Sequence, residues 1–305
     1  MTIPLLAEVI AIGDELTSGQ RLDTNSQWIS TELGLLGVPV VFHTTVTDTL
    51  EAGLQVFRIA CGRADVVVAT GGLGPTADDL TREVLAALSN APLELFLQAL
   101  EDVESRFANR KAPMTPSNRR QAFFPQGSRI IPNPDGTAPG IDLDVSRPGG
   151  GKSRVFALPG VPAEMRTMWR SCVAECIMRM QPKAGVIIHR RMKCFGAGES
   201  TIEAMLPNLI DRDRIPLVGI TAHEATITLR ITARGQNAAE CLAAIAPTEE
   251  TIRASLGQLV YGVDDDEIED AAIVYLQESG QTLATLEIGT AGRVAELLAG
   301  AQIAL

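Results

Sequence analysis

Short apolar runs alternate with helical patterns through the first half of the chain. Three segments rich in β-branched and apolar side chains are predicted strands: residues 8–12, 38–46 and 66–70. Four segments with apolar residues at helical spacing are predicted helices: residues 24–37, 50–61, 79–88 and 93–109. Because strands that alternate with helices pair in parallel, this order predicts an α/β domain with a doubly wound, mostly parallel sheet.

The pattern changes twice further along the chain. A hairpin over residues 141–158 and a helix over residues 162–180 complete a first domain, residues 1–181. A smaller α+β domain is expected over residues 182–262, with predicted elements at residues 186–195, 199–210, 217–221, 225–233, 238–256 and near 260. Residues 263–305, with a strand-like stretch at 282–286 and a helix-like stretch at 291–298, resemble the start of a third domain.

Composition narrows the choice of partners. The 305-residue chain is 46% hydrophobic and carries a net charge of −11, which argues against nucleic acid or an anionic membrane surface as partner. No apolar run approaches the roughly 20 residues that span a bilayer. The five cysteines form no C-x-x-C pair, and the first residues have no basic stretch, so we expect a protein of the reducing cytoplasm.

The strand at residues 66–70 runs directly into a glycine-rich turn containing Gly71, Gly72 and Gly74. Glycines let the backbone approach a ligand closely, and a helix N-terminus favours anions. Asp78 and Asp79 follow and are expected to open the next helix. Because two carboxylates repel a bare phosphate, the turn predicts a phosphate or pyrophosphate accompanied by a divalent metal. A βα turn with capping acids is the plainer alternative.

Other polar groups are expected near the same edge of the sheet. Asp14 and Glu15 follow the first strand and could supply oxygen ligands to the metal or orient a ribose hydroxyl, although a polar loop is the alternative. The stretch Asn118-Arg119-Arg120-Gln121 combines amides with guanidinium groups that match phosphate oxygens. Asn133 and the residues 136–140 add backbone N–H groups and a hydroxyl; ordinary turn chemistry explains both stretches equally well.

A second glycine-rich stretch, residues 148–153, does not fit a P-loop. That motif requires a glycine where Ser146 stands, and it joins a strand to a helix. Here the stretch joins two predicted strands. It is therefore expected to be the tip of a hairpin.

Several motifs in this order resemble the CinA family (competence/damage-inducible protein A-like) over about residues 7–262. They are Gly13-Asp14-Glu15-Leu16, Asp23-Thr24-Asn25, residues 71–76 with 78–81, residues 118–122, 132–134, 136–140 and 158–165, and Gly198-Glu199-Ser200. The resemblance implies a MoaB/Mog-like molybdopterin-binding domain followed by a KH-like domain. It also implies a homodimer with ADP-ribose pyrophosphatase activity that depends on a divalent metal (Mg²⁺, Co²⁺ or Mn²⁺), with K⁺ also implicated.

The strand–glycine–diacid arrangement, with which the resemblance agrees, leads us to assign candidate roles to these residues. Asp78, Asp79, Asp14 and Arg119 are the catalytic candidates, with Arg82 as a second cation, and Asp78, Asp79 and Glu15 are the metal candidates. The candidates for ligand binding are Gly71, Gly72, Gly74, Thr76, Asn25, Asn118, Asn133, Gly136, Thr137, Gly160 and Glu164. The expected substrate is a nucleoside diphosphate compound. A pterin-phosphate binder and a non-catalytic nucleotide sensor are the alternatives.

Relatives in this family often continue into a nicotinamide-mononucleotide amidohydrolase domain that opens on Ala-Glu-Ser-Cys-Thr-Gly-Gly with a nucleophilic serine. The corresponding stretch is residues 286–292, in which Ile288 stands at the position of the serine and Gly289 at that of the cysteine. An isoleucine side chain cannot attack an amide. We therefore expect no deamidase activity from this chain.

Overall fold

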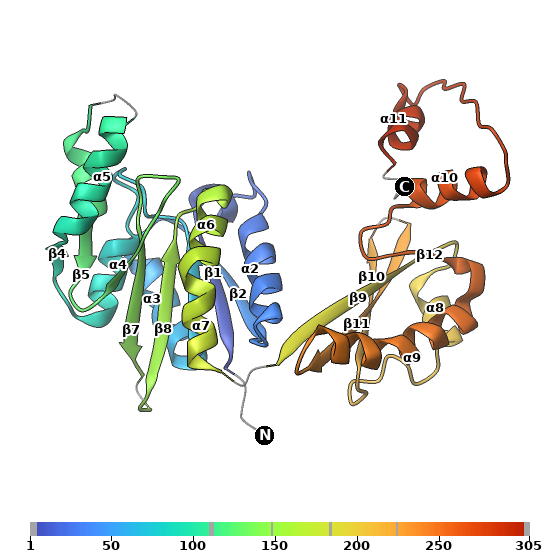
Figure 1. Cartoon of the computed structure of the whole chain (residues 1–305), viewed down its shortest axis with the longest axis horizontal. Coiled ribbons are helices and arrows are strands. Elements are labelled where there is room, and N and C mark those ends of the chain that lie inside the picture. Colours follow the sequence, from blue (N-terminus) through green and yellow to red (C-terminus); the bar gives the residue numbers. More distant parts are fainter. Residues whose placement is uncertain (1–4, 110–112, 148, 183–184, 224, 302–305) are drawn as a thin grey trace. The chain divides into compact units, whose positions relative to one another are not determined.

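The N-terminal part of the chain forms a six-stranded sheet in the order β2-β1-β3-β8-β7-β6 (Figure 1). The computed structural model describes residues 5–109, 113–147, 149–182, 185–223 and 225–301. The strands are β1 (Ala7–Ile12), β2 (Val40–Val46), β3 (Val66–Thr70), β6 (Arg129–Ile131), β7 (Gly140–Ser146) and β8 (Lys152–Leu158). Strands β2, β1, β3 and β8 pair in parallel, whereas β7 pairs antiparallel with both β8 and β6.

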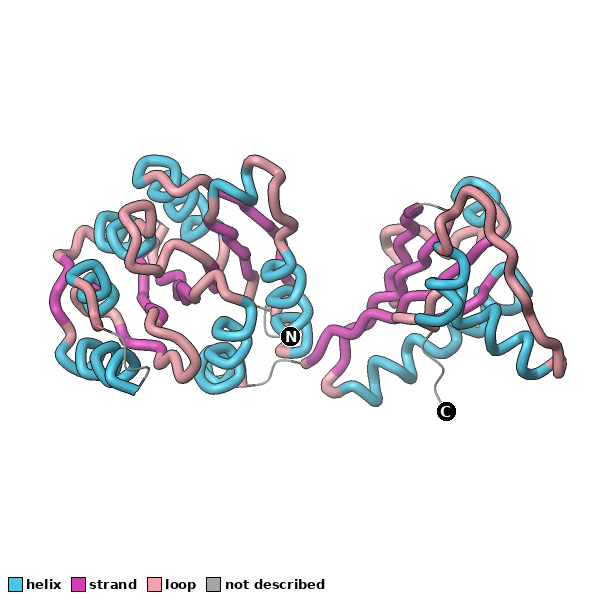
Figure 2. The backbone as a smooth tube through the Cα atoms, turned by 90° about the horizontal axis from the view of Figure 1, so that it is seen from above, coloured by secondary structure: helices cyan, strands magenta, loops and turns pink. Residues whose placement is uncertain are grey.

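Helices cover both faces of this sheet, as Figure 2 shows from above. One apolar cluster joins Val66 and Val68 to Ile29 and Trp169, and the other joins Val67 to Phe57 and Leu85. The helices on these faces are α2 (Thr24–Leu35), α3 (Leu50–Arg63), α4 (Thr81–Ser89), α6 (Pro162–Met168) and α7 (Ala174–Met180). Alternate residues of β3 thus face opposite layers, which confirms the predicted doubly wound α/β fold.

Three local predictions for this unit need correction. Residues 93–109 do not form one helix: β4 (Leu93–Leu95) pairs with β5 (Phe123–Pro125), and α5 (Leu97–Asn109) follows. The stacking of Phe96 on Phe124, with ring centroids 5.0 Å apart, supports this pairing over local helix propensity. The predicted helix at residues 162–180 is interrupted by a π-helix (Trp169–Val173). A short helix α1 (Asp14–Thr17) and a 3₁₀ helix η1 (Pro116–Ala122) were not predicted.

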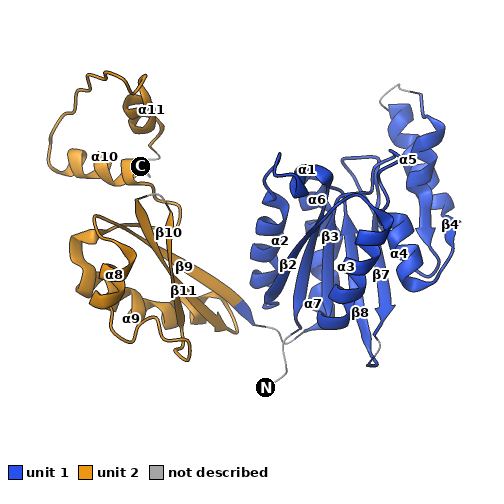
Figure 3. Ribbon diagram, turned by 180° about the vertical axis from the view of Figure 1, so that it is seen from behind, with its two compact units in different colours: residues 1–186 blue, residues 187–305 orange. Residues whose placement is uncertain are grey.

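A second compact unit begins at Ile187 (Figure 3). Its elements are β9 (Val186–Phe195), α8 (Glu199–Met205), β10 (Leu217–His223), β11 (Thr226–Gly235), α9 (Ala238–Leu256), a 3₁₀ helix η3 (Gly257–Leu259) and β12 (Val260–Val263). The sheet order is β10-β11-β9-β12. Helix α9 closely matches the prediction, whereas α8 ends five residues before the expected position 210.

Residues 263–301 cluster with this second unit. They contain α10 (Ile268–Glu278) and α11 (Arg293–Gly300), and neither helix buries a residue. The strand expected at residues 282–286 is absent from this described stretch, where Leu286 is 91% exposed. A strand needs a neighbour to complete its ladder, and the described sheets place none beside these residues.

Candidate functional site

A cavity of about 490 Å³ opens at the carboxyl edge of the parallel strands. Its lining includes residues that follow all four of them: Gly13 and Glu15 after β1, Asp48 after β2, residues 71–75, 78 and 79 after β3, and residues 159–162 and 164 after β8. Gln121, Thr137 and Ala138 complete one wall. The strand order β2-β1-β3 places the cavity where the chain direction across the sheet reverses, which is where open α/β sheets bind ligands.

The turn after β3 requires glycine for two separate reasons. Gly71 and Gly72 have φ angles of 108° and 64°, which side chains of L-amino acids rarely adopt. A Cβ atom on Gly71 would also lie 2.2 Å from the carbonyl oxygen of Ile12, and one on Gly72 would lie 2.3 Å from Thr81 Oγ1. Thr81 Oγ1 itself donates a hydrogen bond of 2.9 Å to the carbonyl of Gly71. The turn is therefore packed tightly against β1 and α4.

A buried guanidinium group supports the same turn. Arg82 is 2% exposed and donates hydrogen bonds to the carbonyls of Leu73 and, at 3.2 Å, Gly74. Burial lowers the pKa of Arg82 to about 10, so this side chain remains protonated at neutral pH. The carbonyls of the turn are thus bonded to a buried, positively charged side chain.

The predicted cation Arg119 is exposed and lies outside the cavity lining. Its neighbour Arg120 is the arginine that contacts the turn after β3. Arg120 pairs with Glu83 at 2.9 Å and donates a hydrogen bond to the carbonyl of Thr76 at 3.1 Å. In a short 3₁₀ helix, adjacent side chains point in different directions, and the sequence does not show which one meets the turn.

Asp78 and Asp79 do not open α4 as expected, because that helix begins at Thr81 with Leu80 as its N-cap. Asp79 instead accepts hydrogen bonds from the backbone N–H of Thr76, at 2.9 Å, and from its hydroxyl. Asp79 therefore closes the turn on itself, as short acidic side chains often do. Asp78 is exposed and lines the cavity, and interaction with the Thr76 side chain lowers its pKa.

A further acid, Asp48, joins this edge and was missed from the sequence. It exchanges hydrogen bonds with Asp14: the Asp14 N–H donates to Asp48 Oδ2 at 2.8 Å, and the Asp48 N–H donates to Asp14 Oδ1 at 3.2 Å. Burial raises the pKa of Asp48, and the negative charges of Asp14, Glu15 and Asp78 raise it further. The available signal was its position two residues after β2, at the same edge as the other loops.

These carboxylates do not form a preassembled metal shell. Across the described parts of the chain, no group of three or more His, Cys, Asp or Glu side chains is placed to hold one ion. The metal candidates Asp78, Asp79 and Glu15, with Asp14 as a possible further ligand, therefore form no such group. The physical reason is that Asp79 binds Thr76 and Asp14 is engaged with the loop after β2.

Two predicted ligand-binding amides shape loops instead. Asn133 donates to the carbonyl of Ala138 and to Glu164, and it accepts from the N–H of Gly136 at 2.8 Å. Asn118 accepts from the N–H and the hydroxyl of Thr115 and so caps η1. The carboxylate of Glu164 packs where a Cβ of Gly136 would lie, 2.0 Å away.

The predicted residues thus divide into two groups. Those that line the cavity are Glu15, Gly71, Gly72, Gly74, Asp78, Asp79, Thr137, Gly160 and Glu164. Those outside its lining are Asp14, Asn25, Thr76, Asn118, Arg119, Asn133 and Gly136.

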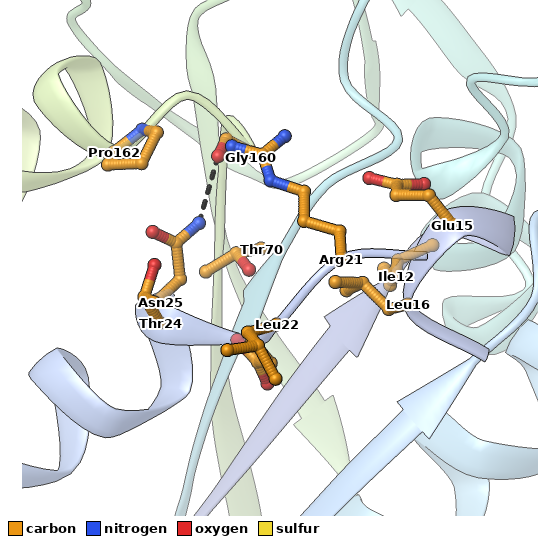
Figure 4. A pocket seen from close by; sticks show the side chains of 11 residues that line it. Ile12, Glu15, Leu16, Arg21, Leu22, Thr24, Asn25, Thr70, Gly160 and Pro162 are labelled. Carbon is orange, nitrogen blue, oxygen red and sulfur yellow. Dashed lines mark hydrogen bonds between the residues drawn. The ribbon is translucent and has the colours of Figure 1, made fainter. Parts of the chain in front are cut away.

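A smaller pocket of about 30 Å³ adjoins the cavity and shares Ile12, Glu15, Arg21, Gly160 and Pro162 with it. Here Asn25 Nδ2 donates to the carbonyl of Gly160 at 2.9 Å, which ties the loop after β8 to the start of α2. Figure 4 shows this bond, with the guanidinium group of Arg21 lying between Asn25 and Glu15 in that view. Arg21 is a cation of the site that the sequence patterns did not reveal.

Comparison with known proteins decides the family. Residues 8–179 match the model of a probable molybdopterin binding domain, and residues 189–262 match the KH domain of damage-inducible protein CinA. A CinA-like protein of Synechococcus elongatus is 37% identical over 96% of this chain and 68% of its own length. The chain belongs to the CinA family. This confirms the resemblance seen in its motifs.

Other members of the family agree with this assignment. A putative competence-damage inducible protein of Caldanaerobacter subterraneus is 39% identical over 95% of this chain and 68% of its own length. The crystal structure of CinA from Thermoplasma acidophilum, a protein of unknown function, is 34% identical with a TM-score of 0.52 and covers 57% of this chain and 98% of its own. Among the described residues, none of the helices has the length and apolar character needed to cross a bilayer.

Proposed function

We propose that this protein is a metal-dependent hydrolase of a phosphoanhydride, acting on ADP-ribose or a related nucleoside diphosphate compound. The observation that carries the proposal is the cavity itself. It brings the glycine turn after β3 together with carboxylates that follow β1, β2 and β3. The substrate class is the one that the resemblance to the CinA family implies.

The acidic edge suits a cation that arrives together with phosphate. Asp48 feels the negative charges of three neighbouring carboxylates, so a positive ion at this edge would relieve their repulsion. Mg²⁺ is usually held by one or two carboxylates together with substrate phosphates, and an all-protein cage is not needed. Asp78 and Glu15, which line the cavity, would hold the ion. When bound, the ion would polarise the phosphorus and lower the pKa of an attacking water.

The chain's own groups would position the diphosphate. Gly72 and Gly74 present backbone without side chains to the cavity, so phosphate oxygens can approach closely. Arg21 lines the same space, and the buried charge of Arg82 lies directly behind the turn. Both cations would attract the phosphates and offset part of their negative charge.

The proposal is tested by Asp78→Asn, assayed with ADP-ribose against Mg²⁺, Co²⁺ and Mn²⁺, with K⁺ present and absent. Because Asp78 is exposed, the variant keeps its fold, and we expect kcat/KM to fall by about 100-fold through loss of a metal ligand. Asp213→Asn, at an exposed acid of the second unit, is the matched control and keeps the parent rate. Hydrolysis by Asp78→Asn at the parent rate would refute the assignment.

The match to a probable molybdopterin binding domain favours a second candidate, a protein that binds a pterin phosphate without hydrolysing diphosphates. The same glycine turn would serve that ligand, since a fold does not determine chemistry. Calorimetry with molybdopterin separates the two candidates. Tight binding of molybdopterin without turnover of ADP-ribose would support the second.

A further inference from the structure

The wall of the cavity contains a buried amide whose hydrogen-bonding groups have no partner. Gln121 is 0% exposed and lines the cavity, as do Leu73 and Ala138. Neither Nε2 nor Oε1 has a hydrogen-bond partner among the residues that the structure describes. Leaving such a group unsatisfied is costly, and native proteins seldom do so without a reason.

The backbone on both sides holds this amide in place. Arg120 is fixed by its ion pair with Glu83 and by its bond to the carbonyl of Thr76. On the other side, the carbonyl of Ala122 accepts from the N–H of Phe96 at 2.9 Å, and Ala122 is fully buried. The amide is therefore held at the cavity wall by neighbours that are themselves anchored, which is the preorganisation a recognition group needs.

The chemistry of an amide indicates what it would recognise. A glutamine side chain offers a donor and an acceptor side by side. Phosphate oxygens only accept, so a phosphate would satisfy Nε2 and leave Oε1 unpaired. A heteroaromatic ring with a donor and an acceptor on neighbouring atoms, as in adenine, satisfies both groups. The apolar side chains of Leu73, Ala138 and Pro75, which line the same cavity, suit the faces of such a ring.

We propose that Gln121 is a specificity-determining residue that binds the donor–acceptor edge of the ligand's heterocyclic ring. The inference rests on the proposed function only in taking this cavity as the ligand site. It divides the site between a ring end at Gln121 and a phosphate end at the glycine turn and the carboxylates. The ring chemistry is shared by purines and pterins, and the experiment distinguishes them.

The experiment measures binding by calorimetry without added divalent metal, so that the proposed hydrolysis does not consume ADP-ribose during the titration. The probes are ADP-ribose, its analogue with an unsubstituted purine in place of adenine, inorganic pyrophosphate and 6-hydroxymethylpterin. The parent is expected to bind the purine analogue about 10-fold more weakly than ADP-ribose, because the analogue lacks the exocyclic donor. Equal affinity of the parent for these two compounds would overturn the proposal for adenine. This comparison needs no variant.

Gln121→Met keeps the length of the side chain and removes both polar groups. We expect it to weaken the ring-bearing ligand by about 10- to 100-fold, to leave pyrophosphate binding unchanged and to abolish discrimination against the purine analogue. A preference for 6-hydroxymethylpterin that depends on Gln121 would assign the pterin as the ring. Gln126→Met, at an exposed glutamine close by in sequence, is the matched control and keeps parental binding.

The outcomes also separate this inference from the proposed function. Ring binding that depends on Gln121 without hydrolysis of any diphosphate would refute the hydrolase and support the inference. Hydrolysis of ADP-ribose by Gln121→Met with the parental KM would refute the inference and leave the hydrolase standing. A purely structural role for Gln121 would change stability without changing the ranking of the four ligands.

Discussion

Two glycine-rich turns in the N-terminal unit both contain glycines with positive φ angles and differ in their surroundings. Gly71 and Gly72 have φ angles of 108° and 64°, and Gly150 and Gly151 have 87° and 82°. Around Gly150 and Gly151, an added Cβ would meet nothing within 4 Å, whereas at Gly71 it would meet backbone at 2.2 Å. Positive φ therefore marks a turn in both places. The turn at Gly71, which lines the cavity, differs in two ways. Its glycines are crowded by neighbouring atoms, and it lies at the carboxyl edge of the parallel strands.

The largest expected change in the free energy of unfolding is that of Gly71→Ala. Gly150→Ala, in the other turn, is the matched comparison. Both variants incur the cost of alanine at positive φ, about 1 kcal/mol. Gly71→Ala also drives a methyl group against the Ile12 carbonyl, so we expect its loss of unfolding free energy to reach about 3 kcal/mol. Urea titration measures both. Equal losses in the two variants would contradict the claim that crowding separates the turns.

Arg82→Met is expected to have the next largest effect. It removes two hydrogen bonds to the turn's carbonyls and leaves those carbonyls in a buried place, at a cost of about 2 kcal/mol. Lys152→Met, beside the other glycine-rich turn, is exposed and should change stability by less than about 0.5 kcal/mol. Amide hydrogen exchange at residues 72–74 provides a second measurement. Faster exchange is expected in Arg82→Met. Unchanged exchange would show that the turn is stable without the hydrogen bonds of Arg82.

Asp48→Asn is expected to change stability least of these variants, and to raise it where the others lower it. In the folded protein the pKa of Asp48 is raised, so the unfolded chain loses this proton first as pH rises, and the parent loses stability over that interval. Asparagine does not titrate, and its side-chain oxygen can still accept from the N–H of Asp14. We expect the variant's Tm to exceed the parent's by about 1–2 °C near pH 7.

The difference in Tm between Asp48→Asn and the parent should shrink as pH falls below the ordinary range for aspartate, where both side chains are neutral. Thermal melts from pH 3 to pH 8 measure it, with Asp213→Asn as the control outside the acidic edge. A lower Tm for Asp48→Asn at every pH would show that attraction, rather than repulsion, dominates around Asp48.

The sequence predicted the sheet and the edge at which the cavity opens, because both depend on local patterns. The apolar run in β3 and the glycines after it are contiguous, and parallel strands place their carboxyl ends together. It could not predict which side chains reach the cavity. Asp48 lines the cavity but has no motif around it, and within the polar stretch 118–121 only Gln121 lines the cavity.

Tertiary contacts also changed the role of several predicted residues. Asn133 and Asn118 belong to polar motifs that suit ligand binding, yet Asn133 bonds the backbone of its own loop and Glu164, and Asn118 bonds Thr115. Asp79 looked like a helix-opening acid and instead closes the turn through Thr76. In each case a partner is a backbone group. Because every residue carries backbone groups, sequence patterns do not show which one a polar side chain will bond.

The lining of the cavity comes from loops between residues 12 and 164, after every one of the four parallel strands. A chain that has paired only β1, β2 and β3 would still lack the loop after β8, and with it one side of the cavity. A ligand would therefore bind only the completed sheet, and its binding free energy would add to the cooperativity of the whole unit. Occupancy of the site would thus report whether this unit has finished folding.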